Sequence, residues 1–358
     1  MNAVAPIASE ADGFAASLLD WYDVHGRKDL PWQRERTPYR VWVSEIMLQQ
    51  TQVRTVIGYF ERFVAALPTL AALAAASEDR VLALWSGLGY YSRARNLLRA
   101  ARLCATEHAG ELPRDIEALS ALPGIGRSTA AAILAQAHGE RHAILDGNVR
   151  RALARWHGVR GWPGSHAAQR TLWDYAERHT PHARIADYTQ AIMDLGATLC
   201  TRSRPRCGEC PVSGGCVALQ DGLTGVLPEP KPRRALPTHT TTMLIVRDAR
   251  GRVLLERRPP TGVWARLWSL PETESADTAQ AHVLRRHDVR ADPTRALESF
   301  VHTFSHYHLQ ITPLLLDGIG PAKAVADRDD SGWFTTDELG SLGLPAPVRK
   351  LFATLEED

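Results

Sequence analysis

Residues 122–130 read LPGIGRSTA and place two glycines around a single isoleucine. The pattern predicts a helix that ends before the glycines and a second helix that begins with RSTAAAILAQA. Glycine lets the backbone turn tightly and approach another molecule closely. The amides of Gly124 to Gly126 would then lie at a helix N-terminus, which suits an anion such as a DNA phosphate. These residues alone fit an ordinary corner between two helices, without any ligand, just as well.

The chain has 358 residues, which is enough for two or more domains, and 44% of them are hydrophobic. No apolar run approaches the length of a membrane span, and the N-terminal residues lack the pattern of a secretory signal. We therefore expect a cytoplasmic protein with reduced thiols. The net charge of +2 neither requires nor excludes nucleic acid as a partner.

Two kinds of pattern divide the chain. Residues 10–220 are rich in alanine and leucine, have no convincing β-alternation and are predicted to be helical. A linker rich in proline and glycine follows at 222–238. The remainder predicts a β-hairpin around DARG (248–251), a helix near 277–287, strands in SFVHTF and YHLQITPLLLD, and a last helix near 346–356. The sequence thus predicts an all-α region over 1–221 and an α/β or α+β module over 239–358.

A glutamate lies in an apolar helical stripe of VWVSEIMLQQTQV (41–53). Helical spacing places five residues on one face, namely Trp42, Glu45, Ile46, Gln49 and Val53. Desolvation there should raise the pKa of Glu45, and an acid that stays protonated near neutrality can donate a proton to a purine base. A carboxylate at the edge of the stripe, in a surface ion pair, is an equally good interpretation.

Asp146 lies twenty positions after Gly126 and precedes VRRALARW, whose Val149, Leu153 and Trp156 form an apolar helical face. An aspartate in this position commonly caps the helix. The helix dipole should keep it ionised, and a fixed anion there could stabilise a cationic sugar. An acid and a carboxylate together are typical of glycoside cleavage.

Four cysteines follow the spacing C-x6-C-x2-C-x5-C, and Cys104 stands apart from them. In a cytoplasmic chain this density favours a metal site over disulfides, although the spacing leaves zinc and iron–sulfur both open. The loop between the first two contains Arg202, Arg204 and Arg206, which either contact phosphates or are simply solvated. The four candidate ligands are Cys200, Cys207, Cys210 and Cys216.

Taken together, these motifs resemble the helix-hairpin-helix superfamily of DNA glycosylases. Within it, LPW (30–32), SEIMLQQTQV (44–53), GLGYYSRARNL (87–97), LDGNV (145–149) and the four cysteines are similar to the MutY-type adenine DNA glycosylases. The resemblance covers nearly the whole chain. It implies a six-helix hairpin domain over about 34–140, a [4Fe–4S] cluster domain over about 10–33 and 141–221, and a Nudix-like recognition domain over 239–358.

The resemblance also implies an activity, which is hydrolysis of the N-glycosidic bond of adenine opposite 8-oxoguanine or guanine in base-excision repair. Glu45 would protonate adenine N7, Asp146 would stabilise the deoxyribosyl cation, and Asn148 would help to orient them. Related enzymes with GxGxKTA use the lysine to form a Schiff base, but this chain has Ser128 at that place, and the only lysine of its helical body is Lys28. Without the amine, we expect no strand cleavage by this route. Ser128 either helps positioning or only caps a helix.

Other residues are expected to contact DNA by the same resemblance. Gln50 and Tyr90 would fill the gap left by an extruded base, flanked by Thr51 and Leu88. Trp32 would line the adenine pocket, although a core tryptophan is a rival interpretation. Gly124 and Gly126 would bind phosphate. Three arginines of one helix would follow the DNA backbone or coat the helix, namely Arg93, Arg95 and Arg99.

In the C-terminal module, AHVLRRHDVR (281–290) stands where a Nudix hydrolase needs a run of the type RExxEExG. The carboxylates for a divalent metal are missing, so we expect a binding fold without nucleotide hydrolysis. Phe304, Ser305 and His306 match the loop that family members use to recognise 8-oxoguanine. His302, His306 and His308 would lie on one face of a strand, where zinc is a weaker alternative to exposed residues near DNA.

The sequence leaves two rival functions. One is a glycosylase for another mismatch such as T·G, and the other is a non-catalytic protein that binds DNA lesions. We expect a monomer, associated with the bacterial nucleoid, whose partner is double-stranded DNA and not a membrane.

Overall fold

The computed structural model describes residues 13–231, 235–321, 330–340 and 342–355. Several predicted segments have parts outside the described residues, namely 10–12, 232–234 and 356. By their contacts the residues form two compact units, which are Met1–Ala75 with Arg99–Arg233 and Ala76–Leu98 with Arg234–Asp358.

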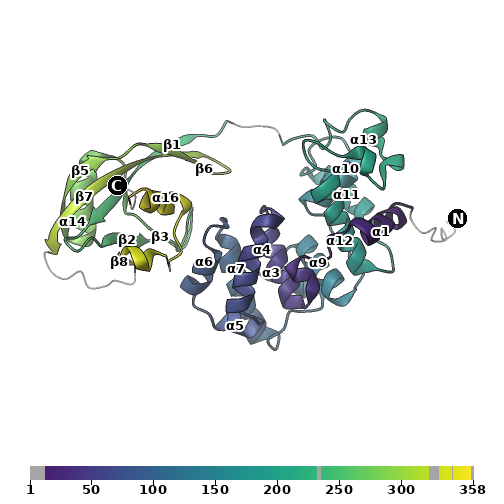
Figure 1. Cartoon of the computed structure of the whole chain (residues 1–358), viewed down its shortest axis with the longest axis horizontal. Coiled ribbons are helices and arrows are strands. Elements are labelled where there is room, and N and C mark those ends of the chain that lie inside the picture. Colours follow the sequence, from purple (N-terminus) through teal and green to yellow (C-terminus); the bar gives the residue numbers. More distant parts are fainter. Residues whose placement is uncertain (1–12, 232–234, 322–329, 341, 356–358) are drawn as a thin grey trace. The chain divides into compact units, whose positions relative to one another are not determined.

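The described residues between 13 and 231 form helices and turns without a β-strand, so the all-α prediction is confirmed (Figure 1). The α-helices are α1 (Gly13–His25), α2 (Pro31–Arg34), α3 (Pro38–Leu48), α4 (Val53–Ala66), α5 (Leu70–Ala75), α6 (Glu78–Trp85), α7 (Ser92–Glu107), α8 (Ile116–Ala121), α9 (Arg127–His138), α10 (Gly147–Trp156), α11 (His166–His179), α12 (Ile185–Asp194) and α13 (Val217–Gln220). The π-helix η1 (Leu195–Leu199) continues α12, and two 3-10 turns, η2 (Cys207–Glu209) and η3 (Ser213–Gly215), follow.

The two-glycine segment forms the predicted corner between α8 and α9. Gly124 has φ +81°, in the left-handed region that favours glycine, and Gly126 is the N-cap of α9. Ile125 between them is buried and anchors the turn. The prediction of two helices joined at the glycines is confirmed.

The helix around Glu45 is shorter than the sequence pattern suggested. Helix α3 ends at Leu48, and Gln50 adopts φ +58°, which reverses the chain before α4 begins at Val53. The prediction that Gln49 and Val53 share a helical face with Glu45 is therefore wrong. Trp42 and Ile46 do form the buried part of that face, as expected.

The first unit has a core built by α1, α10, α11, α12 and η1. Its buried members include Leu18, Leu153, Leu172, Ile192 and Leu199. The predicted apolar face of α10 lies against this core, so Asp146 at the start of α10 is held by packing of the whole helix. Since α3 and α12 both pack against α9, the core also fixes the elements around Glu45.

The C-terminal part of the second unit contains an eight-stranded mixed sheet with the order β3-β2-β1-β7-β5. Strands β1 and β7 are parallel and the other pairs are antiparallel; β4 pairs with β1, β6 with β7 and β8 with β2. The predicted hairpin around DARG is confirmed by the pairing of Arg247 with Val253. The strands are β1 (Thr238–Arg247), β2 (Val253–Arg257), β3 (Trp268–Ser269), β4 (Glu272–Thr273), β5 (Val289–Ala296), β6 (Phe300–Thr303), β7 (His308–Pro321) and β8 (Ser331–Phe334).

Helices cover both faces of this sheet. Met243 and Ile245 pack with α16 (Ala346–Leu355), whereas Leu244 and Val246 pack with α14 (Ala279–His287) on the opposite face. The alternation follows from the strand period of two. Both helices confirm predictions, and two shorter elements, η4 (Ala276–Thr278) and α15 (Thr336–Leu339), complete the described part.

A glycine contact in the first unit gives a stability prediction. A Cβ at Gly196 would lie 2.6 Å from Cβ and 2.9 Å from the backbone oxygen of Asn148, whereas a Cβ at Gly147 meets nothing within 4 Å. Gly196→Ala should therefore lower the free energy of unfolding by about 1–3 kcal/mol, through overpacking against backbone. Urea unfolding checks this value. Gly147→Ala, which changes the same helix start without a clash, is the control, and an equal loss in both variants would contradict the packing argument.

Candidate functional site

Glu45 lies on α3 with part of its surface accessible, between the buried Ser44 and Ile46. Gln136 of α9 donates a hydrogen bond from Nε2 to Glu45 Oε1 at 3.2 Å. Among the described residues, no hydrogen bond reaches Oε2. Burial of the carboxyl, together with the charge of Asp146, raises the pKa of Glu45 to about 8, and the bond from Gln136 opposes this shift. Glu45 is thus a protonated acid at neutral pH, with one oxygen open.

Asp146 caps α10, as the sequence predicted. Its Oδ1 accepts the backbone N–H groups of Asn148 (3.0 Å) and Val149 (2.7 Å). These bonds and the charges of Arg151 and Arg150 lower its pKa, but burial outweighs them and the pKa is raised. The expected stabilisation of the charged form at the helix start is therefore present, but desolvation opposes it and is the larger effect on the pKa.

The two carboxyl groups act on each other through their charges. The anion of Asp146 disfavours ionisation of Glu45, so the pair shares its protons unequally. Backbone N–H donors and two arginines favour the charged form of Asp146, whereas Glu45 has one neutral amide donor. We assign the proton to Glu45 and the negative charge to Asp146.

Ser128 has a positioning contact and does not cap its own helix. Its Oγ accepts a hydrogen bond from the backbone N–H of Leu145 at 3.0 Å. Ser128, in the first turn of α9, therefore holds the chain directly before Asp146. On the other side, Arg151 donates to Asn148 Oδ1 at 2.8 Å and to the backbone oxygen of Cys200 at 2.8 Å. The start of α10 is therefore fixed from two directions.

Sequence patterns did not identify three buried glutamines near Glu45, which are Gln33, Gln136 and Gln190. They are joined by amide hydrogen bonds across 103 and 157 residues of sequence. Partners so far apart leave no local spacing in the sequence. The one signal is a single glutamine within an otherwise apolar helical stretch, such as Gln136 in AAAILAQA.

Two residues expected to enter the DNA have left-handed backbones. Gln50 in the first unit has φ +58°, and Tyr90 in the second unit has φ +48° with 53% of its surface exposed. A positive φ in these residue types is a strained conformation that recurs at functional loops. Of their predicted neighbours, Thr51 is partly exposed and Leu88 is buried. Their contact with DNA stays a prediction.

Two predictions about flanking residues change with the structure. Arg93 is buried, and its guanidinium donates to the backbone oxygens of Leu88 and Gly89. It supports the loop of Tyr90, so the expectation that it coats a helix or follows DNA is wrong. Trp32 is 3% exposed and packs edge-on against Phe60, which fits the core interpretation of this residue.

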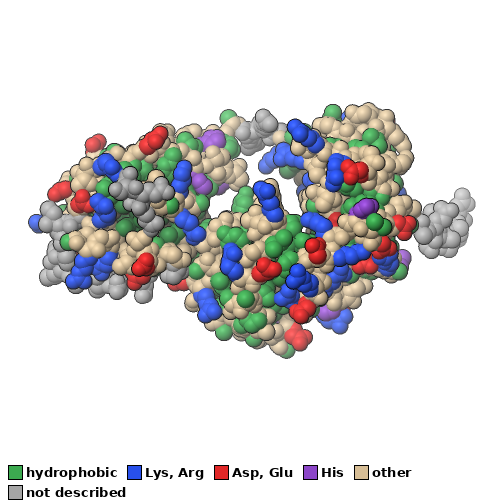
Figure 2. All heavy atoms as spheres, viewed as in Figure 1, with side chains coloured by type: hydrophobic (Ala, Val, Ile, Leu, Met, Phe, Trp, Pro, Cys, Tyr) green, Lys and Arg blue, Asp and Glu red, His purple; other side chains and the backbone are tan. Residues whose placement is uncertain are grey.

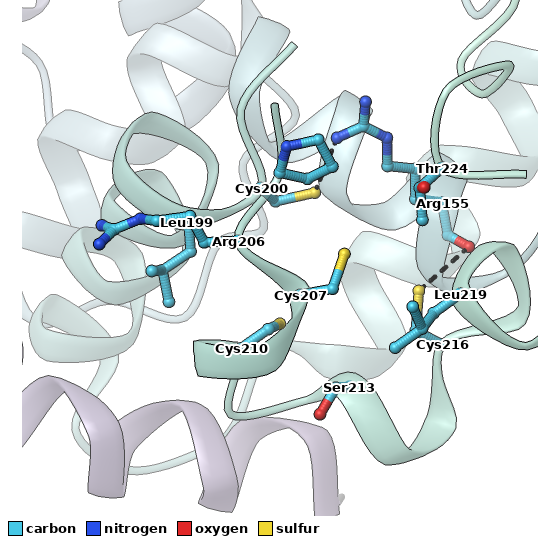
Figure 3. A pocket seen from close by; sticks show the side chains of 11 residues that line it. Arg155, Leu199, Cys200, Arg206, Cys207, Cys210, Ser213, Cys216, Leu219 and Thr224 are labelled. Atoms are coloured by element: carbon cyan, nitrogen blue, oxygen red, sulfur yellow. Dashed lines mark hydrogen bonds between the residues drawn. The ribbon is translucent and has the colours of Figure 1, made fainter. Parts of the chain in front are cut away.

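The four cysteines of the motif line one pocket (Figure 3). All four are free and half-buried, whereas Cys104 is fully buried and lies outside the residues that line the cavity. Among the described residues, no three His, Cys, Asp or Glu side chains lie close enough to hold a single metal ion. Four cysteines around one pocket form a candidate site for a metal ion or an iron–sulfur cluster.

Arg155 organises the chain around these cysteines, although no sequence pattern singled it out. It is 2% exposed and donates to Cys200 Sγ (3.4 Å), to the backbone oxygen of Thr201 (2.7 Å) and to that of Leu227 (2.7 Å). In the loop between the first two cysteines, Arg206 pairs with Glu209 at 2.9 Å. The loop also exposes Arg202 and Arg204, as a phosphate contact would require.

The predicted recognition loop connects β6 to β7. Ser305 and His306 are exposed, and Phe304 packs among aromatic rings that include Trp264 and Tyr307. The expectation that His302, His306 and His308 share one face of a strand is wrong, because β6 ends at Thr303 and the chain turns before His308.

Charges of both signs are interspersed on the molecular face drawn in Figure 2. The predicted phosphate contacts therefore lie at local features, namely the α9 N-terminus and the cysteine loop. No helix within the described ranges is both long and apolar enough to cross a membrane.

The chain matches three family models. They are the HhH-GPD superfamily of base excision DNA repair proteins (residues 43–178), the iron–sulfur binding domain of endonuclease III (200–216) and the NUDIX domain (242–354). An adenine DNA glycosylase of Buchnera aphidicola (subsp. Acyrthosiphon pisum) is 33% identical over 96% of this chain and 98% of that protein. The chain belongs to the adenine DNA glycosylase family.

One further relative and two solved structures are also similar to the chain. The human adenine DNA glycosylase is 36% identical over 96% of this chain and 74% of its own length. Among solved structures, a thermostable thymine-DNA glycosylase has a TM-score of 0.53 and 27% identity, and covers 58% of this chain and 95% of its own. An endonuclease III–DNA complex, at 20% identity and a TM-score of 0.50, shows the fold alone. The predicted helix-hairpin-helix body and Nudix-like domain are confirmed.

The cysteine site of this glycosylase is a [4Fe–4S] site, as predicted. The residues present fit the cluster, because four cysteines, the usual ligands of such a cluster, line one pocket. Thiolates held so close together need bound cations. Cys200, Cys207, Cys210 and Cys216 would hold the iron, and the cluster would lock the arginine-bearing loop.

The cysteine geometry predicts that Cys210→Ser lowers iron content and visible absorbance, because a thiolate ligand is lost. Cys104→Ala, which removes the cysteine outside the cavity, should keep both. Iron analysis and absorbance spectra of the purified variants make the comparison. Equal losses in both proteins would contradict the assignment of ligands.

The two carboxyl groups predict a bell-shaped pH dependence of the single-turnover rate of base release. With Glu45 as the predicted general acid, the rate should fall about tenfold per pH unit above pH 8. The low-pH limb of the profile reports protonation of Asp146. Because burial raises the pKa of Asp146, this limb should lie at a higher pH than for an ordinary aspartate. Rates measured from pH 4 to 10 test this, and a rate that already falls between pH 5 and 7 would contradict the assignment.

Proposed function

We propose that this chain hydrolyses the N-glycosidic bond of adenine mispaired with 8-oxoguanine or guanine in double-stranded DNA, and leaves the strand intact. One observation carries the proposal, which is the protonated Glu45 beside the carboxylate of Asp146. Adenine is a poor leaving group as an anion, so a proton donor at the base is the chemistry that the reaction needs.

The reaction divides between the two groups. After the adenine leaves the stack, the open Oε2 of Glu45 gives its proton to N7, and the bond electrons pass to the base as the C1′–N9 bond breaks. The carboxylate of Asp146 stabilises the cationic sugar. Water then adds at C1′ and its proton passes to the carboxylate of Glu45, which completes the hydrolysis and restores the acid form.

The absence of strand cleavage rests on Ser128, which stands at the place of the family's lysine nucleophile. Its hydroxyl is bonded to the N–H of Leu145. Lys28 has other contacts, because its Nζ donates to the backbone oxygen of Asp23 at 2.7 Å and lies over the ring of Tyr22. A Schiff base at the sugar therefore has no amine from these residues.

Recognition of the mispair would use several loop residues that the family resemblance singles out. Gln50 and Tyr90 would fill the gap that the adenine leaves, and the exposed Ser305, with Phe304 and His306, would read the 8-oxoguanine edge. A serine hydroxyl both donates and accepts, as an altered purine edge requires. The protein would act as a monomer on chromosomal DNA in the cytoplasm.

A T·G glycosylase is the nearest rival within the same class. The thymine-DNA glycosylase of known structure matches only 58% of this chain, whereas the relatives that match over 94% or more of it are adenine DNA glycosylases. The other rival, a non-catalytic lesion-binding protein, would have no need of a buried acid that keeps its proton at neutral pH.

The test is a single-turnover assay on four duplexes, with adenine opposite 8-oxoguanine, guanine, cytosine and thymine. We expect release of adenine opposite 8-oxoguanine and guanine. Glu45→Gln should lower the rate by at least about 10²-fold, since general acid catalysis contributes that much, while duplex binding is kept. Borohydride should trap no Schiff-base adduct.

Three results would contradict the proposal. Wild-type protein that releases no adenine from the 8-oxoguanine duplex would exclude the enzyme. A fully active Glu45→Gln variant would exclude the acid, and abundant borohydride trapping would exclude the argument from Ser128.

A further inference from the structure

A row of buried hydrogen bonds connects an ion pair to Glu45 within the first unit. At one end, Arg27 donates from Nη2 (2.6 Å) and Nε (2.9 Å) to Asp194 Oδ1, and from its backbone N–H to Oδ2 (2.8 Å). Gln190 then donates from Nε2 to Asp194 Oδ1 at 2.7 Å. Asp194 and Gln190 are almost fully buried.

The row continues through two further amides. Gln33 donates from Nε2 to the side-chain oxygens of Gln190 (2.5 Å) and Gln136 (3.0 Å). Gln136 in turn donates from Nε2 to Glu45 Oε1 at 3.2 Å. Gln33 and Gln136 are buried as well, so water does not compete strongly for these groups.

The Arg27–Asp194 ion pair at the far end of the row determines which way each glutamine amide is turned. A carboxylate paired with arginine accepts hydrogen bonds only, so Gln190 must turn its NH₂ group to Asp194 and its oxygen to Gln33. Gln33 must then present its NH₂ group. The oxygen of Gln136 meets that group, and its own NH₂ group is left for Glu45.

This direction decides which oxygen of Glu45 carries the proton. Because Oε1 receives an N–H from Gln136, a proton on Oε1 would face a donor, so the proton resides on Oε2. Oε2 is the oxygen that no described protein group bonds. After the proton has left, the same N–H stabilises the carboxylate.

We propose that Gln190, Gln33 and Gln136 form an amide relay, oriented by the Arg27–Asp194 ion pair, that places the transferable proton of Glu45 on its open oxygen. These glutamines are positioning residues, and the proposal rests on the function of Glu45 as the acid. The relay also sets how readily Glu45 ionises, since it ends in a donor that favours the charged form.

The charged group that acts on Glu45 from outside the relay is Asp146 at the start of α10, whose anion favours the protonated acid. From α9 the facing group is the neutral amide of Gln136, and from α12 the charge of Asp194 is held by Arg27. A change in one of the glutamines therefore alters the hydrogen bond without adding or removing a charge near Glu45.

The experiment measures the single-turnover rate of adenine release against pH for wild-type protein, Gln136→Met and Gln190→Met. Methionine keeps the length of the side chain and removes the amide. The high-pH limb of Gln136→Met should move up by about half to one pH unit, because a donor to the carboxylate is lost, and its plateau rate should fall. Gln190→Met should shift the limb in the same direction by less.

Gln169→Met is the matched control, since its amide donates to the backbone oxygen of Gly164 outside the relay. Its pH profile should equal that of wild type. If Gln136→Met does not fold, Gln136→Asn gives the same prediction, because the shorter amide no longer reaches Glu45. Circular dichroism and the cluster absorbance confirm that the variants tested are folded.

If the folded Gln136 variant has a lower rate but its high-pH limb stays at the wild-type pH, Gln136 has only a structural role. That result would overturn the proposal. A shift in Gln136→Met with none in Gln190→Met would overturn the relay. Wild-type protein that releases no adenine would instead contradict the proposed function, so the two failures are distinguishable.

Discussion

The chemistry of the candidate site depends on the burial of one carboxyl group, that of Glu45, close enough to Asp146 to interact with its charge. Glu45 keeps its proton at neutral pH because desolvation and the anion of Asp146 both disfavour its ionised form. Both the desolvation of Glu45 and the effect of the Asp146 charge require α3 and the start of α10 to stay in place. The rest of the fold must therefore offset the free-energy cost of burying these polar groups. The hydrophobic core of the first unit, the Ser128 bond to Leu145 and the contacts of Arg151 supply that support.

The burial of these two carboxyl groups also explains why hydrogen-bonding groups surround them in a partly apolar interior. Without hydrogen-bond partners, the carboxyl groups of Glu45 and Asp146 would not be held in one orientation. The amide of Gln136 and the N–H groups at the start of α10 each fix one carboxyl oxygen. The cysteine segment is connected to this arrangement through Arg151, which contacts both Asn148 and the backbone of Cys200. Loop residues that would meet DNA are then carried on rigid supports, as Gln50 follows α3 directly.

Much of this was predictable from local sequence, because caps, helix corners and cysteine spacing are short-range patterns. The turn at Gly124, the cap at Asp146 and the cysteine cavity all follow from neighbouring residues. The end of α3 was not, since its left-handed residue, Gln50, is not glycine. Strand β5 contains Pro293 and irregular pairing, which hide its alternation. The glutamine row joins partners from distant segments, so only the folded chain displays it.

The central claim is that Glu45 is protonated at neutral pH. Infrared difference spectra of wild-type protein, with the Glu45 band assigned by its absence in Glu45→Gln, measure this state directly during a pH titration. The account predicts a protonated carboxyl band that is present at pH 7 and disappears around pH 8. A Glu45 band that has already vanished well below pH 7, as in an ordinary exposed glutamate, would contradict it.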